Sequence, residues 1–253
     1  MSGASRDALV AYLDEFLDTP AWSDKSLNGL QVEGAERIRR VALATDTAQA
    51  TIDMAVEAGA QMLVAHHGLF WGRVEPVTGP LRSRLAALLA AEISLYVSHL
   101  PLDAHPEVGN NAVLARLLEL RDVAPFGAWG GGAIGVMGRL SETLDRAGLA
   151  ARLEALLGAR PDVLAFGPDA IARVALVSGA AADLIPEAAA AGVDAFVTGE
   201  TSHTAVHQAR ERHLNVLFAG HYATETLGVR ALGDHLAERF GLETVFLDAP
   251  TGF

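Results

Sequence analysis

The segment VALATDTAQATIDMAVEAGAQMLVAHH, residues 41–67, sets the fold of this chain. Its two short apolar runs, VALAT and QMLVA, predict strands. The stretch between them has the spacing of an amphipathic helix and ends at Gly59. The same alternation of strand and helix continues on both sides of the segment, which predicts an α/β fold of helices packed on a sheet.

The pattern returns later in the chain. VALVSGAAADLIPEAAAAGVDAFVTGE, from Val174, matches the first segment without gaps at an offset of 133 residues, and it sets Glu200 opposite His67. Alanine-rich α/β segments resemble each other by chance, so this match alone is modest. A second match strengthens it, because YVSHLPLD and FAGHYATE carry H-x3-D and H-x3-E after a predicted strand at a common offset of 122. We therefore predict two similar α/β lobes related by internal duplication.

A glycine cluster, PFGAWGGGAIG at residues 125–135, is the best internal boundary. An ordinary loop is one interpretation of it, and a linker between the lobes is the sharper one. The predicted lobes are therefore residues 1–125 and 126–253, with the C-terminal segment able to return and pack on the first lobe.

The amino-acid composition excludes several classes of partner and of metal site. The 253 residues are 51% hydrophobic and only 6% aromatic, as an aliphatic interior requires, and the formal net charge is −12. RIRR, at residues 37–40, is the only basic run, so nucleic acid is an improbable partner. The chain has no cysteine, which excludes disulfides and thiolate zinc sites. No apolar run has the length of a membrane span and no signal peptide is evident, so we expect a cytoplasmic protein without membrane contact.

Five residues at the carboxyl ends of predicted strands are candidate metal ligands, since that edge is where open α/β sheets bind ligands: His66, His67, Asp103, His221 and Glu225. Mixed imidazole and carboxylate donors suit Zn, Mn, Fe or Co. Five donors exceed the need of one tetrahedral ion and fit two divalent ions about 3.5–4 Å apart, with a bridging carboxylate.

Two structural questions remain open at these residues. His66 and His67 are adjacent, so a regular strand would point them to opposite faces unless the chain turns at Gly68. His221 and Glu225 are four apart on a predicted helix and share a face, although a first-turn Glu also complements the helix dipole. Histidines that only form structural hydrogen bonds are the alternative interpretation. His203 and His207 form another i, i+4 pair, which we interpret as a surface or site-rim pair.

At these residues the sequence resembles the GTP cyclohydrolase 1 type 2 homologue family, the Nif-three-like dinuclear metal proteins. The resemblance covers nearly the whole chain and rests on SLNGLQV (26–32), VAHHGLFW (64–71), SHLPLDAHPEVGNN (98–111), VTGETSH (197–203) and AGHYATETLGVRAL (219–232). It implies two similar α/β lobes that face each other across a dinuclear metal site, in subunits that assemble as a ring-shaped homohexamer.

The resemblance also implies roles. His66 and Asp103 match ligands of one ion, His67 and His221 match ligands of the other, and Glu225 matches the bridging carboxylate. Polar positions of the pocket are matched by Asn28, His99 and Glu200. The family more often begins this motif D-N-x-G, whereas SLNG has Leu27 directly before the Asn and Asp24 three residues earlier, which puts an acidic contribution in doubt.

The family label implies hydrolytic opening of the guanine imidazole ring of GTP by metal-activated water. The ligands themselves do not choose among an imidazole carbon, a phosphoester and an amide as the target. We therefore expect a metal-dependent hydrolase that acts on a nucleotide-like small molecule, with Glu200 or His99 as the catalytic proton shuttle. The alternative is a metal-containing binding, regulatory or scaffold protein without turnover.

Overall fold

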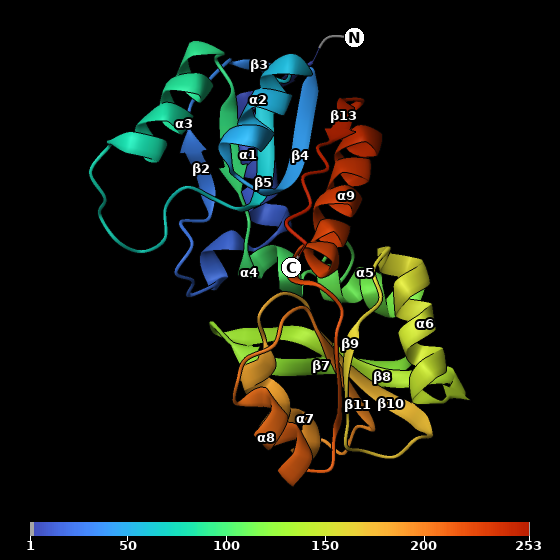
Figure 1. Cartoon of the computed structure of the whole chain (residues 1–253). Coiled ribbons are helices and arrows are strands. Elements are labelled where there is room, and N and C mark those ends of the chain that lie inside the picture. Colours follow the sequence, from blue (N-terminus) through green and yellow to red (C-terminus); the bar gives the residue numbers. More distant parts are fainter. Residues whose placement is uncertain (1–2, 253) are drawn as a thin grey trace. The chain divides into compact units, whose positions relative to one another are not determined.

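The computed structural model describes residues 3–252, and these form two compact units. Unit 1 runs to Val108 and includes Gly228–Ala249, whereas unit 2 comprises Gly109–Leu227 and continues from Pro250. Each unit contains a sheet with helices on it (Figure 1). The α/β fold predicted from the sequence is confirmed. The division into related lobes at residue 125 remains a prediction.

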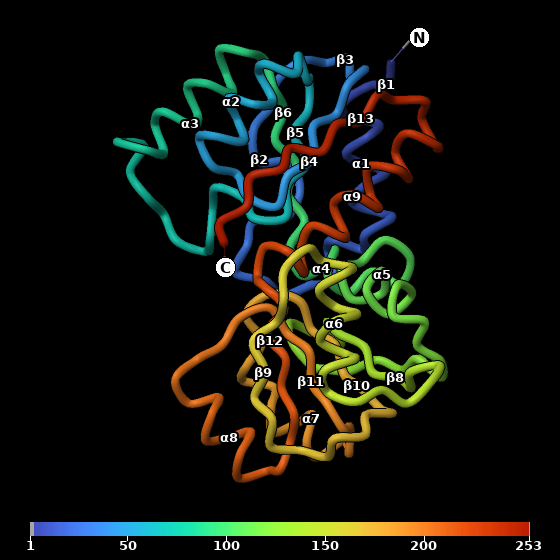
Figure 2. The backbone as a smooth tube through the Cα atoms, turned by 45° about the vertical axis from the view of Figure 1, so that its right-hand side comes forward, coloured from blue at the N-terminus to red at the C-terminus, as the bar shows by residue number. Residues whose placement is uncertain are grey.

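The sheet of unit 1 has the strand order β13-β4-β5-β6-β2. β4, β5 and β6 are parallel, β13 is parallel to β4, and β2 is antiparallel to β6. Figure 2 shows these strands side by side. The strands are β2 (Gly29–Val32), β4 (Arg40–Asp46), β5 (Met62–His67), β6 (Ser94–Val97) and β13 (Glu243–Phe246), and β1 (Ala4–Ser5) and β3 (Arg37–Ile38) form a separate pair.

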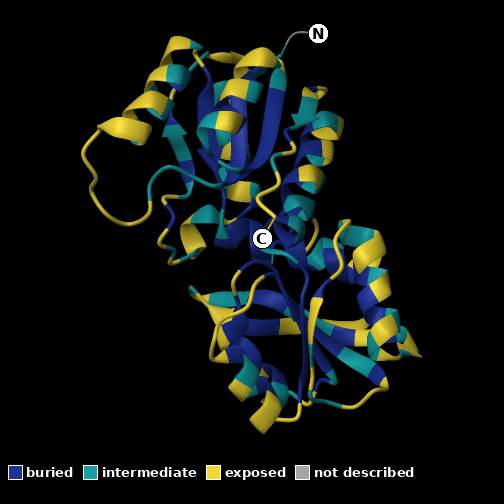
Figure 3. Ribbon diagram, viewed as in Figure 1, coloured by how far each residue is buried: buried dark blue, intermediate teal, exposed yellow. Residues whose placement is uncertain are grey.

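Apolar side chains cover both faces of this sheet, so the central strands are buried (Figure 3). Val41 and Leu43 pack with α1 and the later part of α9, whereas Ala42 and Ala44 pack with α2 and α3. Successive side chains of β4 thus point to opposite faces of the sheet and pack in different hydrophobic clusters. The helices are α1 (Arg6–Phe16), α2 (Gln49–Glu57), α3 (Gly79–Ala90), α4 (Leu100–Ala104) and the part of α9 (His221–Phe240) from Gly228 on, with a 3-10 turn η1 at Thr19–Ala21.

The sheet of unit 2 has the order β7-β8-β10-β11-β12-β9. β10, β11 and β12 are parallel, and the other neighbours are antiparallel. The strands are β7 (Arg121–Trp129), β8 (Gly132–Leu144), β9 (Asp162–Ala165), β10 (Ile171–Val177), β11 (Ala195–Thr198) and β12 (Asn215–Phe218). The helices are α5 (Asn110–Leu117), α6 (Arg146–Leu157), α7 (Ile185–Ala190) and α8 (Ala205–Glu211), with η2 at Ala182–Leu184.

The segment 41–67 folds as expected, into β4, α2 and β5. The glycine cluster is part of a β-hairpin, because β7 and β8 pair across a turn at Gly130 and Gly131 with φ of 61° and 106°. Glycine adopts such positive φ values without a Cβ clash. None of the helices within residues 3–252 combines the length and apolarity needed to cross a membrane.

Candidate functional site

His66 and His67 end β5 in unit 1, and each ring is held through Nδ1. The Nδ1–H of His66 donates to the carbonyl oxygen of Ser98 at 3.0 Å, and that of His67 donates to Oδ1 of Asp46 at 2.8 Å. A carbonyl and a carboxylate only accept, so these bonds put the ring proton on Nδ1. The Nε2 atoms therefore take the form that binds metal, with a hydrogen-bonded oxygen behind each ring, as in many metal sites.

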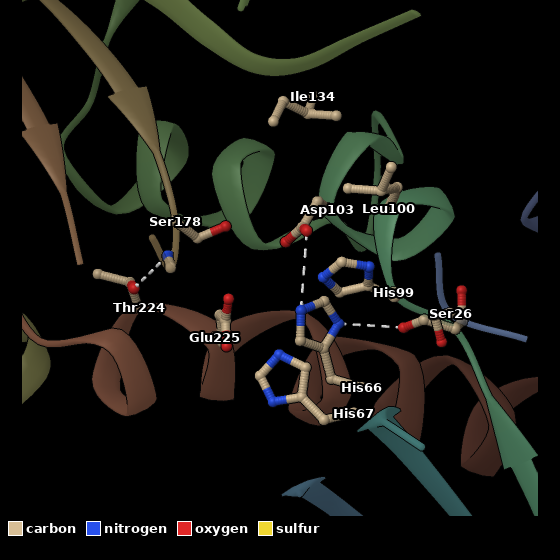
Figure 4. Close-up of polar contacts among 12 residues, drawn as sticks. Ser26, His66, His67, His99, Leu100, Asp103, Ile134, Ser178, Thr224 and Glu225 are labelled. Atoms are coloured by element: carbon tan, nitrogen blue, oxygen red, sulfur yellow. Dashed lines mark hydrogen bonds and ion pairs between the residues drawn. The ribbon is translucent and has the colours of Figure 1, made fainter. Parts of the chain in front are cut away.

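The rings of three histidines gather in unit 1 (Figure 4). The ring centroids of His66 and His67 are 4.6 Å apart, and those of His66 and His99 are 5.0 Å apart. Each of the three offers a ligand atom, and these atoms lie within 4.8 Å of one another, so the group could hold a metal ion. Asp103, buried on α4, is next to this group, with Oδ2 3.7 Å from Nε2 of His66. That spacing suits two ligands on one ion better than a direct hydrogen bond.

Gly68 has a spatial role at this point. A Cβ there would lie 2.5 Å from Nε2 of the Gln31 side chain and 2.7 Å from Val97 Cγ2. The φ of Gly68 is not in the left-handed range. Gly68 is therefore needed for close packing rather than for a special backbone angle. Both rings reach the same group of side chains at the end of the strand.

His99 is anchored by Asp24. The Asp24 carboxylate accepts from Nδ1 of His99 at 3.0 Å and from Nδ2 of Asn28 at 3.0 Å, and Asn28 Oδ1 accepts from the His99 backbone N–H at 2.8 Å. Burial raises the pKa of Asp24, but the hydrogen bonds from His99 and Asn28 outweigh it and hold that pKa below its usual range. The acid in doubt in the SLNG motif is therefore supplied by Asp24, which orients His99.

His221 and Glu225 lie in unit 2, on the first turns of α9. The Nδ1 of His221 is 2.8 Å from Oε2 of Glu200, and its Nε2 is 3.0 Å from Oε2 of Glu225. The hydrogen bond to Glu225 outweighs the effect of burial and raises the pKa of His221 to about 9. At neutral pH this pKa makes the ring an imidazolium that donates to both carboxylates, and a divalent cation could take the place of its Nε2 proton.

Two glycines make room for this pair. Gly179, which follows β10, has φ of +66°, and a Cβ there would collide with the carboxylate of Glu225. Its backbone N–H donates to Oγ1 of Thr224 at 3.0 Å. At Gly199 a Cβ would come within 2.8 Å of the His221 Cα. Sequence reasoning missed Gly179, although the offset of 133 residues aligns it with Asp46, which was missed as well.

The five predicted metal ligands thus divide between the units. His66, His67 and Asp103 lie in unit 1 together with His99 and Asn28, whereas His221, Glu225 and Glu200 lie in unit 2. Their assignment as ligands or catalytic groups remains a prediction. The competing pair, His203 and His207, is exposed, and its ring centroids are 6.0 Å apart at the start of α8.

Comparison with known proteins supplies the family. The model of the family described as Duf34/NIF3 (NGG1p interacting factor 3) matches residues 4–251. The chain belongs to the Duf34/NIF3 family. Among curated relatives, the GTP cyclohydrolase 1 type 2 homolog of Deinococcus radiodurans is 48% identical over 98% of this chain and 94% of its own length. The homolog of the same name from Escherichia coli is 43% identical over 96% of this chain and 97% of its own.

Two solved structures have the same fold. TTHA1606 from Thermus thermophilus is 47% identical and superposes with a TM-score of 0.92, covering 99% of this chain and 100% of that one. Protein ybgI, a protein of unknown function, is 41% identical with a TM-score of 0.91, over 98% and 99% of the two chains. The resemblance inferred from the sequence motifs is thus confirmed.

Proposed function

We propose that this Duf34/NIF3 protein is a cytoplasmic, dinuclear-metal hydrolase that acts on a nucleotide-like small molecule. The observation that carries the proposal is the way in which hydrogen bonds orient the imidazole rings. In His66, His67 and His221 alike, Nδ1 bonds to an oxygen acceptor, which directs Nε2 toward other ligand atoms. Histidines with only a structural role need no such common arrangement. The names of the curated relatives support a nucleotide as the substrate class.

The proposed centre takes ligands from both units. His66 and Asp103 would hold one ion, His67 and His221 the other, and Glu225 would bridge them. Imidazole and carboxylate donors without thiolates fit Zn, Mn, Fe or Co. Two such ions would lower the pKa of a bound water and stabilise the negative charge that develops during hydrolysis. The two-lobe arrangement, with the lobes related by duplication and facing this centre, is part of the same proposal.

The chain's own residues would have separate tasks. Asp46 and Glu200 fix the rings of His67 and His221 through 2.8 Å hydrogen bonds, so orientation is the main role that we assign to Glu200. His99 is the better proton shuttle, because Asp24 holds Nδ1 and leaves Nε2 toward the histidine group. A His–Asp pair of this kind can move a proton to a leaving group. Asn28 keeps the backbone at His99 in place.

The test is a turnover screen of the metal-loaded protein against GTP, phosphodiesters and cyclic amides, with and without a chelator. We expect chelator-sensitive turnover of one class, together with metal analysis that finds two ions per chain. His99→Gln should lower that turnover while two ions remain bound. Two bound ions with no turnover of any class would contradict the hydrolase proposal and favour a metal-containing binding, regulatory or scaffold protein.

We also propose a homohexamer, as the family resemblance implies. Light scattering of the purified chain should then give a mass about six times the 26.5 kDa of one subunit. A monomer at all concentrations would contradict this assembly without bearing on the metal ligands.

A further inference from the structure

Three arginines form a row across the antiparallel side of the sheet in unit 2. Arg139 on β8 pairs directly with Arg121 on β7 and with Arg173 on β10. Directly paired residues extend to the same face of a sheet, and like charges in that position repel each other. This local cluster of positive charge contrasts with the chain as a whole, which has 19 basic and 31 acidic residues. Such an arrangement favours the binding of an anion, although solvent screens part of the repulsion.

Among the described residues, no acidic side chain forms an ion pair with this row. Within residues 3–252, none of these three guanidiniums forms an ion pair, whereas Arg146 pairs with Asp169. Asp194 lies beside Arg173, but its Oδ2 accepts from the backbone N–H groups of Ala172 and Arg173 at 2.9 and 2.8 Å. That carboxylate therefore holds the start of β10 and is not engaged with a guanidinium.

Two of the arginines line a cavity. A pocket of about 240 Å³ is bounded by Arg139 and Arg173 together with Asp122, Met137 and Val193, among others. Arg139 is exposed and Arg173 is half-buried, so at least one side of the pocket is open to solvent. Met137 and Val193 add an apolar wall, and Asp122 is the one acid among the lining residues. The lining thus carries a net positive charge.

We propose that this pocket is a binding site for a phosphoryl group, carried by a small organic molecule or present as free phosphate. Guanidinium groups donate planar pairs of N–H bonds that match phosphate oxygens, and a phosphoryl dianion has enough oxygens for two of them. It would also remove the repulsion within the row. The apolar wall and Asp122 would contact the organic part of a phosphoester. None of the candidate metal ligands takes part.

The test is a calorimetric titration of the full chain with inorganic phosphate at fixed ionic strength. We expect one site per chain, with Arg139→Gln and Arg173→Gln each weakening it at least tenfold. Arg160→Gln is the matched control, since Arg160 is exposed and outside the pocket, and it should change the affinity less than twofold. Equal loss in the control, or no loss in the pocket variants, would overturn the proposal.

Two further measurements distinguish a phosphoester from free phosphate as the occupant, and the arginine pocket from the metal centre as the binding site. Tighter binding of glycerol phosphate than of inorganic phosphate would identify a phosphoester as the occupant, and the reverse order would identify free phosphate, with glycerol alone as the blank. The affinity should persist after chelation of all metal, and its disappearance would place the phosphate at the metal centre instead.

Thermal unfolding distinguishes a variant that has lost phosphate binding from a variant that does not fold. In phosphate-free buffer Arg139→Gln should melt no lower than the parent, because it removes a repulsive neighbour. Added phosphate should raise the melting temperature of the parent and of Arg160→Gln, as ligand binding to the folded state requires, but not that of Arg139→Gln. Equal stabilisation of all three proteins would contradict a site in this pocket.

Discussion

The hydrogen-bond partner of each imidazole decides what that residue can do. His66 is fully buried and bonded to a backbone carbonyl, so its ring has one fixed orientation, whereas the His67 ring is set by the carboxylate of Asp46. These acceptors determine the tautomer of each ring, which would lower the cost of ordering the site if an ion binds there.

Glu225 is the residue whose loss should affect the proposed centre most. A bridging carboxylate screens two dications from each other, and at a separation of about 4 Å such charge terms reach several kcal/mol even at an effective dielectric near 20. Glu225→Gln keeps the shape of the side chain but removes its charge. We expect this variant to bind at most one ion per chain and to remain folded, as checked by elemental analysis beside circular dichroism.

The control for Glu225→Gln is Glu238→Gln, which removes an exposed carboxylate from the same helix, α9. It should retain two ions. If Glu225→Gln also retained two ions at full occupancy, the assignment of Glu225 as the bridge would be wrong.

Among the elements, the turn after β10 depends on Gly179. Its positive φ and the contact that a Cβ would make with Glu225 both oppose substitution. Gly158→Ala is a matched control, because Gly158 ends α6 with φ of +81° and a Cβ there meets open space. We expect about 1 kcal/mol of destabilisation in both variants from the backbone angle. Gly179→Ala should lose more unfolding free energy than Gly158→Ala and should also bind less metal. Denaturant unfolding and metal analysis are the measurements. Equal destabilisation of the two variants would argue against the steric role of Gly179.

His105 links α4 to the segment that follows it. Its Nε2–H donates to the carbonyl of Phe16 at 2.9 Å, and its Nδ1 accepts from the backbone of Glu107 and Val108 at 3.2 and 3.1 Å. Burial lowers the pKa of His105, and nearby His235 lowers it further, against the opposing effects of Phe16 and Glu107. The folded state therefore favours the neutral ring.

The lowered pKa of His105 determines how this residue makes the stability of the protein depend on pH. Above pH 6.5, the ordinary histidine pKa, the ring is neutral in both states and its full contribution to stability is present. As the pH falls below that value the unfolded chain binds the proton first, so stability is lost until the folded ring also titrates. His105→Gln should therefore reduce the loss of stability between neutral pH and pH about 5. His207→Gln, at an exposed histidine, should leave the profile unchanged; denaturant melts across this range are the measurement.

For the whole molecule, the proposal that both units share an ion has a direct thermodynamic test. His67 belongs to unit 1 and His221 to unit 2. If they ligate the same ion, His67→Ala and His221→Ala should each remove it, and the double variant should lose little more metal affinity than either single one. Chelation should also lower the melting temperature of the parent more than that of either variant. Additive losses in the cycle, read by calorimetric metal titration, would mean separate sites.

Local sequence pattern determined a large part of this protein. The alternation of apolar strand and amphipathic helix in residues 41–67 was enough to predict β4, α2 and β5, because the period of apolar residues is a property of the element itself. The position of His and acidic residues after those strands was enough to predict candidate ligands and, with the longer motifs, the family.

Only the tertiary structure decided which groups support those candidate site residues. Asp24 lies 75 residues from His99 in sequence, Glu200 lies 21 from His221, and Gly68 is required by the Gln31 and Val97 side chains beside it. The arginine row likewise exists only through the register of β7, β8 and β10. Spacing along a chain fixes directions within one helix or strand, whereas partners in different elements are set by strand pairing and packing, which the local pattern does not encode.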